Sequence, residues 1–256
     1  MTGKSHIIDA TTLGDLLLRA VVQHADRDAL VFPDRGYTYR ELWDRSVARA
    51  RSLHGLGIGD GDHVGILMPN CPEYIEVLMG TVLCGAIAVP INARYKAAEL
   101  AYVVENADLK GLVTNDLISE YADFAGLLCA AFPGLAGATE PQALQLPEAP
   151  LLQFAVMLGA EQPGFVSDTA FDGAGEAVDE AVIEILRCRV RVRNPCIMMY
   201  TSGTTANPKG CPLSHEALVR NGINVNRERY FLTEQDRFWA PLPMFHMAAI
   251  LPMTAC

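Results

Sequence analysis

The stretch IMMYTSGTTANPKGCPLSH, residues 197–215, decides how the rest of the chain is interpreted. Its first four residues are apolar and predict a short buried strand. The next ten, residues 201–210, hold four hydroxyl side chains, two glycines, a proline and a lysine. Ser214 is a favoured N-cap, so a helix is predicted from His215. A strand, a loop rich in glycine and hydroxyl groups, and a helix form an arrangement that aims backbone N–H groups at an anion.

The side chains of residues 201–210 fit a phosphate site. Gly203 lets the backbone approach an anion closely because it has no Cβ. Lys209 adds a full positive charge. Hydroxyl donors come from Thr201, Ser202, Thr204 and Thr205. The loop does not match the Walker A pattern, because Gly210 follows the lysine where Ser or Thr is required. The alternative, an ordinary polar turn before a helix, would rarely gather these residue types in ten positions.

Residues 1–114 alternate helical and strand patterns, which is typical of a parallel sheet covered by helices. Strands are predicted at 29–32, 63–68, 86–89 and 111–114. Helices are predicted after the caps Thr12 and Thr38, after Asn70-Cys71-Pro72, and at 96–105. The sequence therefore predicts an α/β fold with mainly parallel sheet layers flanked by helices.

Residues 115–190 lack this regularity. The chain has no lysine or arginine between Lys110 and Arg187 but twelve acidic residues there. We expect a peripheral insertion or a loosely packed connection whose charge forms a solvated face. Four arginines then alternate with smaller residues, which predicts a strand with four guanidinium groups on one face, either paired with the acidic stretch or binding an anion. They are Arg187, Arg189, Arg191 and Arg193.

Composition excludes several classes of function. A net charge of -10 with no concentrated basic surface argues against nucleic-acid binding. The seven cysteines form no CxxC pair and no cluster with metal-ligand spacing, so neither zinc nor a disulfide framework is indicated and a cytoplasmic location is expected. The longest nearly uncharged run, residues 77–91, is too short for a membrane span and predicts a buried helix passing into a strand.

Four motifs resemble the adenylate-forming (AMP-binding) superfamily, which includes acyl-CoA synthetases, luciferases and peptide-synthetase adenylation domains. YTSGTTANPKG, residues 200–210, is similar to the phosphate-loop signature of that family. YTYRELW (37–43), GTVLCGAIAVPIN (80–92) and PLPMFHMAA (241–249) resemble other family segments, the last of which lines the acyl pocket. The motifs leave only about 115–190 uncovered. Ala206 departs from the family's second glycine, and an alanine is tolerated unless that position needs a positive φ.

The resemblance implies a partial N-terminal AMP-binding domain spanning residues 1–256, with a region of repeated helices and strands (1–114), an acidic variable region (115–190), a phosphate-loop and acyl-pocket segment (191–256) and no C-terminal domain. It implies a two-step reaction in which a small carboxylic acid attacks the α-phosphate of ATP and coenzyme A then displaces AMP. Residues 201–210 would hold the β- and γ-phosphates with Mg²⁺. A loop threonine would contact the metal, although the sequence does not say which one.

The resemblance also assigns roles to residues near the C-terminal end. His246 is expected to act at the reacting carboxylate as a gate or hydrogen-bond donor, the alternative being a core histidine. Phe245, Met244 and Met247 either line the acyl pocket or pack in the core. His215 is expected on the surface of the helix that follows the loop.

The chain ends within the apolar run AAILPMTAC, at roughly half the length that the resemblance predicts. We therefore expect little adenylation activity from the 256 residues alone. Three hypotheses remain: a coenzyme A ligase for an apolar or aryl carboxylate, another adenylate-forming enzyme such as an adenylation domain or a luciferase-like oxygenase, and a non-catalytic nucleotide-binding remnant.

Overall fold

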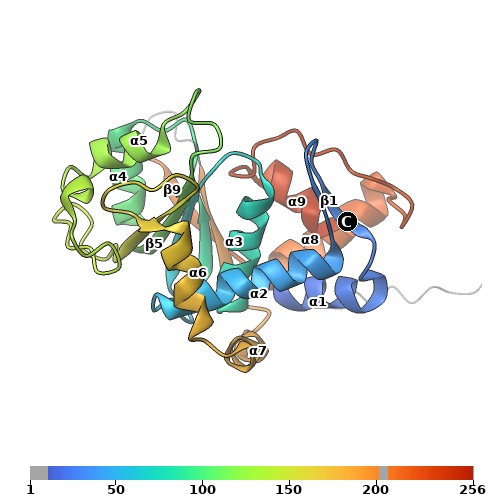
Figure 1. Ribbon diagram of the computed structural model, residues 1–256. Coiled ribbons are helices and arrows are strands. Elements are labelled where there is room, and N and C mark those ends of the chain that lie inside the picture. Colours follow the sequence, from blue (N-terminus) through green and yellow to red (C-terminus); the bar gives the residue numbers. More distant parts are fainter. Residues whose placement is uncertain (1–10, 202–206, 256) are drawn as a thin grey trace, which may run out of the picture.

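The computed structural model describes residues 11–201 and 207–255, which form an α/β structure around one large sheet (Figure 1). The helices are α1 (Leu13–His24), α2 (Tyr39–Gly55), α3 (Pro72–Leu83), α4 (Ala97–Asn106), α5 (Phe124–Ala131), α6 (Asp168–Glu176), α7 (Glu180–Arg189), α8 (His215–Val225) and α9 (Met247–Ala255). The strands are β1 (Asp28–Val31), β2 (Gly36–Thr38), β3 (His63–Leu67), β4 (Ile87–Pro90), β5 (Leu109–Asn115), β6 (Phe154–Leu158), β7 (Val166–Ser167), β8 (Pro195–Thr201) and β9 (Lys209–Ser214). Short helical turns lie at η1 (Leu135–Gly137) and η2 (Asn226–Tyr230).

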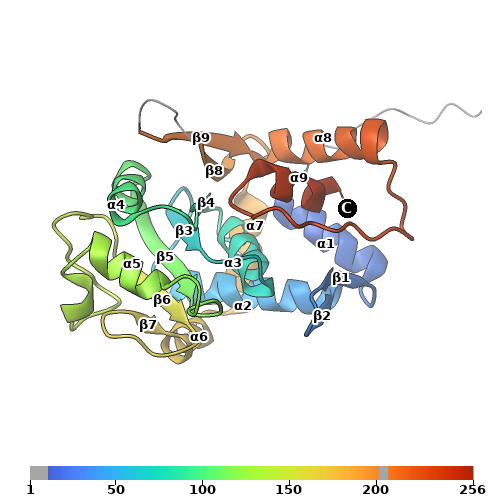
Figure 2. The same cartoon turned by 90° about the horizontal axis from the view of Figure 1, so that it is seen from above.

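The large sheet has the strand order β7-β6-β5-β3-β4-β8-β9. All neighbouring strands are parallel except β8 and β9, which form an antiparallel hairpin. Figure 2 shows this hairpin at one edge of the molecule and β7 at the opposite edge. Strands β1 and β2 form a separate antiparallel pair. The expected mainly parallel sheet is confirmed.

Helices cover both faces of the sheet, and β6 shows how its side chains serve the two layers. Its five residues are all buried. Phe154, Val156 and Leu158 pack in the core beneath α1, α2 and α3, whereas Ala155 and Met157 pack in the core beneath α4 and α5. Alternation between the faces is the period of a strand, and burial on both faces explains why β6 reads as a continuous apolar run.

Local signals placed most elements in the first half correctly. The Thr12 Oγ1 accepts a hydrogen bond from the Asp15 backbone N–H at 3.1 Å at the start of α1. Thr38 and Glu41 form a complete capping box at the start of α2. The apolar run 77–91 is the end of α3 followed by β4, as expected. No helix within residues 11–201 or 207–255 is both long and apolar enough to cross a membrane.

Residues 115–190 are not the peripheral or loosely packed connection that the sequence suggested. They contribute β6, which pairs in parallel with β5 over five residues, and β7, which extends the sheet beyond it. They also contribute α6, whose Phe171 is fully buried. The expectation failed because the prolines that suggested an irregular chain lie in the connections, while β6 and β7 are short and offer little periodicity.

The predicted strand at the four alternating arginines is wrong. Arg187 and Arg189 lie in the last turn of α7, and Arg191 and Arg193 lie in the connection to β8. Asp179 caps α7 through a hydrogen bond from the Ala181 N–H, which starts a helix where the arginine spacing suggested extended chain. The Arg187 Nε donates to Glu184 at 2.9 Å, one turn earlier, so pairing with the acidic stretch is confirmed for that arginine.

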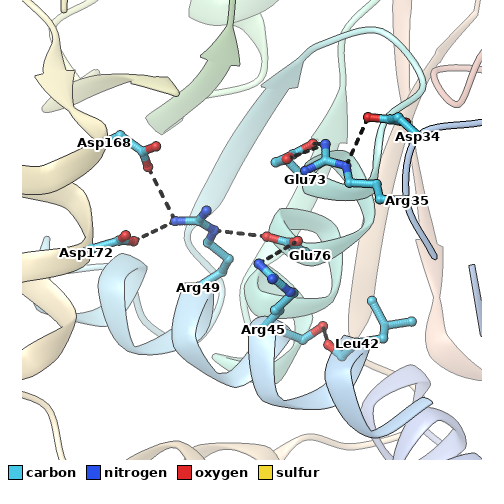
Figure 3. Close-up of polar contacts among 10 residues, drawn as sticks. Asp34, Arg35, Leu42, Arg45, Arg49, Glu73, Glu76, Asp168 and Asp172 are labelled. Atoms are coloured by element: carbon cyan, nitrogen blue, oxygen red, sulfur yellow. Dashed lines mark hydrogen bonds and ion pairs between the residues drawn. The ribbon is translucent and has the colours of Figure 1, made fainter. Parts of the chain in front are cut away.

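A partly buried ion-pair network joins α2, α3 and α6 (Figure 3). The Glu76 side chain is only 1% exposed, and its Oε2 lies 3.3 Å from the Nε of Arg49. The same guanidinium donates to Asp172 at 2.7 Å and lies 3.7 Å from Asp168. Burial raises the pKa of Asp168, and the nearby Arg49 charge opposes that shift. Arg49 thus supplies the counter-charge for carboxylates from two neighbouring helices.

Replacing Arg49 with alanine is expected to lower the free energy of unfolding by about 3 kcal/mol, because the Glu76 carboxylate is left buried without its nearest counter-charge. Urea unfolding followed by circular dichroism measures this loss. The control is Arg227→Ala, which removes an exposed ion pair with Glu228 and should cost at most about 1 kcal/mol.

A double variant tests the assigned cause. Arg49→Met combined with Glu76→Leu removes both charges and should recover most of the stability that Arg49→Ala loses. Equal small losses in Arg49→Ala and Arg227→Ala would contradict a structural role for the Arg49 network.

Candidate functional site

The described ends of residues 201–210 belong to the β8–β9 hairpin. Thr201 is the last residue of β8 and Lys209 the first of β9, and the two face each other as the final pair of the ladder. Both side chains are exposed, and the Thr201 Oγ1 lies 3.5 Å from the Lys209 carbonyl oxygen. Four of the predicted phosphate ligands, Ser202, Gly203, Thr204 and Thr205, lie outside the described residues. The described part therefore brings one predicted hydroxyl donor and the predicted cation together at the base of the loop.

The expected order of strand, loop and helix is wrong in one respect. A second strand, β9, separates the loop from α8, so the helix begins at the far end of the hairpin, roughly 17 Å from Lys209 at a rise of about 3.3 Å per residue. The N-terminus of α8 is thus too far from Lys209 to direct its N–H groups at an anion bound beside that lysine. Residues 209–214 form a strand because they pair with β8 from Thr201 back to Pro195, which an isolated sequence window does not reveal.

Lys209 is available to an anion. Within the described residues its ammonium forms no ion pair, and its side chain is exposed. A lysine bound to a neighbouring carboxylate would have to break that pair before binding phosphate. As far as the described residues go, Lys209 has no such pair to break, and it lies beside Thr201.

Tyr200 connects the β8–β9 hairpin to α4. Its hydroxyl donates a hydrogen bond to the Asn106 Oδ1 at 2.8 Å, at the end of α4. Burial raises the pKa of Tyr200 to about 12, so the phenol remains a donor across the physiological range. Gly210 lies across from Tyr200, and a Cβ there would come within 3.2 Å of the tyrosine hydroxyl. Tyr200 and Gly210 therefore serve the packing of the hairpin rather than direct anion binding.

His215 is not the surface residue that the sequence suggested. It is only 1% exposed, and its Nδ1 accepts a hydrogen bond from the Leu13 backbone N–H at 3.0 Å. Burial lowers the pKa of His215 to about 4, and the Asp15 carboxylate acts in the opposite direction. The neutral ring therefore joins the first turn of α8 to the first turn of α1. The sequence held no local signal for a contact across 202 residues.

The segment 241–246 carries His246 at the start of α9. Met244 and Phe245 are buried, and Met244 packs in the core beneath α1, α2 and α3. For Met244 the core-packing alternative is therefore the one observed. The His246 side chain is exposed, with its ring centroid 4.6 Å from that of Phe245. A core histidine is thus ruled out. The role of His246 at a carboxylate stays a prediction.

Asn70 contacts segment 241–246 in a way that the sequence did not reveal. Its Nδ2 donates to the Leu242 carbonyl oxygen at 2.8 Å, and its Oδ1 accepts from the Met244 N–H at 2.9 Å. In the sequence Asn70 was visible only as part of the signal that starts α3. Its partners lie more than 170 residues away, beyond the reach of any local pattern.

A metal ion bound by the described part of the chain would need several ligand side chains close together. Across residues 11–201 and 207–255, no group of three or more His, Cys, Asp or Glu side chains is arranged to hold a metal ion. The six cysteines in those ranges are all free thiols. The described hairpin therefore offers an anion a hydroxyl and an ammonium group but provides no preformed metal cage.

The family model for AMP-binding enzymes matches residues 17–256, which is nearly the whole chain. The chain belongs to the AMP-binding enzyme family. Among its relatives, YngI of Bacillus subtilis strain 168, which is named as an acyl-CoA synthetase, is 33% identical over 96% of this chain and 45% of its own length. A sulfoacetate–CoA ligase of Cupriavidus necator is 31% identical over 94% of this chain and 42% of its own length.

A solved structure gives the same result for the fold. The anthranilate CoA ligase AuaEII, in complex with anthranoyl-AMP, superposes with a TM-score of 0.77 and 25% identity, covering 98% of this chain and 45% of that one. The chain thus spans less than half the length of these three relatives. It corresponds to the part of an AMP-binding enzyme that carries the phosphate-loop motif.

The buried state of His215 predicts an acid-sensitive fold. The unfolded chain binds a proton at this residue below about pH 6.5, whereas the folded chain resists protonation until about pH 4. The contribution of His215 to stability is therefore complete above pH 6.5 and is lost as the pH falls toward 4, by roughly 3 kcal/mol in total. The measurement is urea unfolding at a series of pH values between 4 and 8.

His215→Asn is the matched variant, because the Asn Oδ1 can replace Nδ1 as the acceptor for the Leu13 N–H but does not titrate. The difference in stability between the parent chain and this variant should change with pH between 4 and 6.5 and stay constant above 7. A constant difference over the whole range would show that His215 does not titrate as its burial requires.

Proposed function

We propose that this chain supplies the nucleotide-phosphate site and part of the carboxylate site of an ATP-dependent acid–thiol ligase that joins a carboxylic acid to coenzyme A. One observation carries the proposal: the two ends of the phosphate-loop motif of an AMP-binding enzyme face each other on a hairpin, where Thr201 lies beside Lys209, a lysine with no ion pair among the described residues. The names of the relatives, which include an acyl-CoA synthetase and two CoA ligases, support the reaction class.

The reaction has two steps. The substrate carboxylate attacks the α-phosphate of ATP, forming an acyl-adenylate and releasing pyrophosphate, and the thiol of coenzyme A then displaces AMP to form the thioester. This chemistry depends on positioning and on charge stabilisation, not on a protein nucleophile. We assign Lys209 to the β- and γ-phosphates, whose charge its ammonium would neutralise. The hydroxyl of Thr201, with those of Ser202, Thr204 and Thr205, would donate hydrogen bonds to the same oxygens.

Magnesium belongs to the proposal only as an ion carried by the nucleotide. Mg²⁺ is commonly bound through substrate phosphates and one or two carboxylates. The described residues near the hairpin supply no acidic cluster, so no step is assigned to a protein-bound metal. The binding of coenzyme A and of the adenine ring would involve regions that the relatives have and this chain does not span.

The carboxylate site is assigned to segment 241–246. The exposed imidazole of His246 at the start of α9 is suited to donate a hydrogen bond to a carboxylate or to gate its entry. Phe245 and Met247 flank it, which favours an apolar or aryl acid over a strongly polar one. A cytoplasmic location is proposed as well, supported by free thiols at all described cysteines.

Two other functions would use the same fold. An adenylation domain or luciferase-like enzyme would share the first step and differ in the acceptor. A non-catalytic remnant would retain the hairpin without the chemistry. Reading the gene beyond Cys256 separates these: a reading frame that supplies the rest of a ligase supports the proposal, a carrier-protein segment supports an adenylation domain, and a stop codon supports the remnant.

The phosphate assignment predicts the effect of a double variant in the longer protein, meaning this chain together with the remaining length of its relatives. Lys209→Ala with Gly203→Val should reduce ATP turnover at least about 100-fold, because a charge is lost and a side chain is placed where the backbone approaches the phosphates. ATP-dependent release of pyrophosphate measures it. Arg193→Ala, which alters an exposed arginine before β8, is the control. Turnover equal to that of the parent would refute the loop assignment.

The 256-residue chain alone is expected to release pyrophosphate at no more than background rate, because it covers 45% of the length of YngI. The test compares the purified chain with the longer protein at matched concentrations of ATP and a panel of carboxylic acids. Turnover by the short chain at about 1 per second or faster, which is a rate typical of enzymes, would show that it is catalytically complete.

A further inference from the structure

The connection between η2 and α9 has no regular secondary structure, yet it must hold the segment that carries His246. Residues 231–246 form no helix or strand. Two exposed ion pairs tie the first part of the connection to the region of β1: Arg27 with Glu234 and Arg237 with Asp28. Exposed pairs contribute little to rigidity. The part nearest His246 is held by the burial of Met244 and Phe245 and by one further side-chain contact.

That contact is the side-chain amide of Asn70. It donates to the Leu242 carbonyl oxygen at 2.8 Å and accepts from the Met244 N–H at 2.9 Å, so both ends of the amide bind one short stretch of backbone. Two opposed hydrogen bonds fix the orientation of the amide, and they fix the backbone between the two residues in the same way that a neighbouring strand would. The His246 N–H then donates to the Pro243 carbonyl at 2.9 Å, within the same turn.

Asn70 stands on a rigid base. It follows β3, the central strand of the large sheet, which pairs with β5 on one side and β4 on the other. It precedes α3, whose first residue is Pro72. The Thr114 hydroxyl donates to the Leu67 carbonyl at 2.6 Å and binds the end of β3 to β5. Cys71, beside Asn70, is 1% exposed. A displacement of Asn70 would thus require movement of the centre of the sheet.

We propose that Asn70 is a positioning residue that sets the place of His246, and hence the affinity for the carboxylate substrate, without acting on ATP. This inference rests on the proposed function, because it names a further residue of the same site. The amide is attached to the segment on the carboxylate side, whereas Thr201 and Lys209 are attached to the β8–β9 hairpin. Loss of the amide should therefore affect the two substrates unequally.

The kinetic test uses Asn70→Ala and Asn70→Asp in the longer protein. Asn70→Ala should raise the KM for the carboxylate about tenfold, as expected for the loss of two hydrogen bonds, and change the KM for ATP less than twofold. Asn70→Asp keeps the acceptor for the Met244 N–H but loses the donor to Leu242, so its effect should be intermediate. The control is Asn194→Ala, which removes one hydrogen bond within a turn before β8 and should leave both constants unchanged.

A second readout does not need enzyme activity. Hydrogen exchange of the 256-residue chain, followed by mass spectrometry, should show faster exchange in peptides covering residues 240–248 of Asn70→Ala and unchanged exchange in peptides of β3 and β5. Unchanged exchange at 240–248 would overturn the positioning role whatever the protein does. Faster exchange there, with equal effects on the KM for ATP and for the carboxylate, would overturn the link to the carboxylate. An inactive longer protein with faster exchange at 240–248 would refute the proposed function and the carboxylate link that rests on it, and would leave only the structural contact.

Discussion

The placement of the phosphate-loop motif depends on the parallel pairing of β8 with β4. The two strands are in register at Ala88 and Ile197, both fully buried. Gly85, with a φ of +77°, makes the turn that leads into β4. Because β8 is held near its buried start, its second half and the first residues of β9, which pair with it, extend as a hairpin beyond that contact (Figure 2). A loop that must meet a flexible polyphosphate is thereby fixed at its base by the core of the sheet.

The same hairpin sets the place of the carboxylate segment through α8 and α9. Gly222 on α8 lies so close to α9 that a Cβ would fall 2.3 Å from the Thr254 hydroxyl. His215, at the start of α8, is bound to the start of α1. Helix α9 in turn begins directly after His246. The hairpin, the two helices and the segment held by Asn70 therefore form one connected unit, so a shift of β8 would move both halves of the proposed site.

Sequence reasoning succeeded where structure follows from neighbours along the chain. Thr38 and Glu41 predicted a capping box because its two hydrogen bonds join residues three apart. It failed where the partner is distant. The burial of His215 depends on α1, and the strand character of residues 209–214 depends on β8. The strand predicted at Arg187 was wrong because arginines can alternate with smaller residues by chance on a helix as well. Only the cap at Asp179 distinguishes the helix from a strand. The residue types at 201–210 predict a phosphate ligand, which stays a prediction, whereas the β8–β9 pairing of Thr201 with Lys209 could be known only from the fold.

The proposed binding of nucleotide phosphates by residues 201–210 can be measured by hydrogen exchange of the longer protein with and without ATP, at saturating carboxylate. We expect ATP to slow exchange in peptides spanning 200–211. Lys209→Ala should remove most of this protection while leaving peptides of β3 and β5 unchanged. Protection by ATP that appears only outside 200–211, or that is the same in Lys209→Ala, would contradict it.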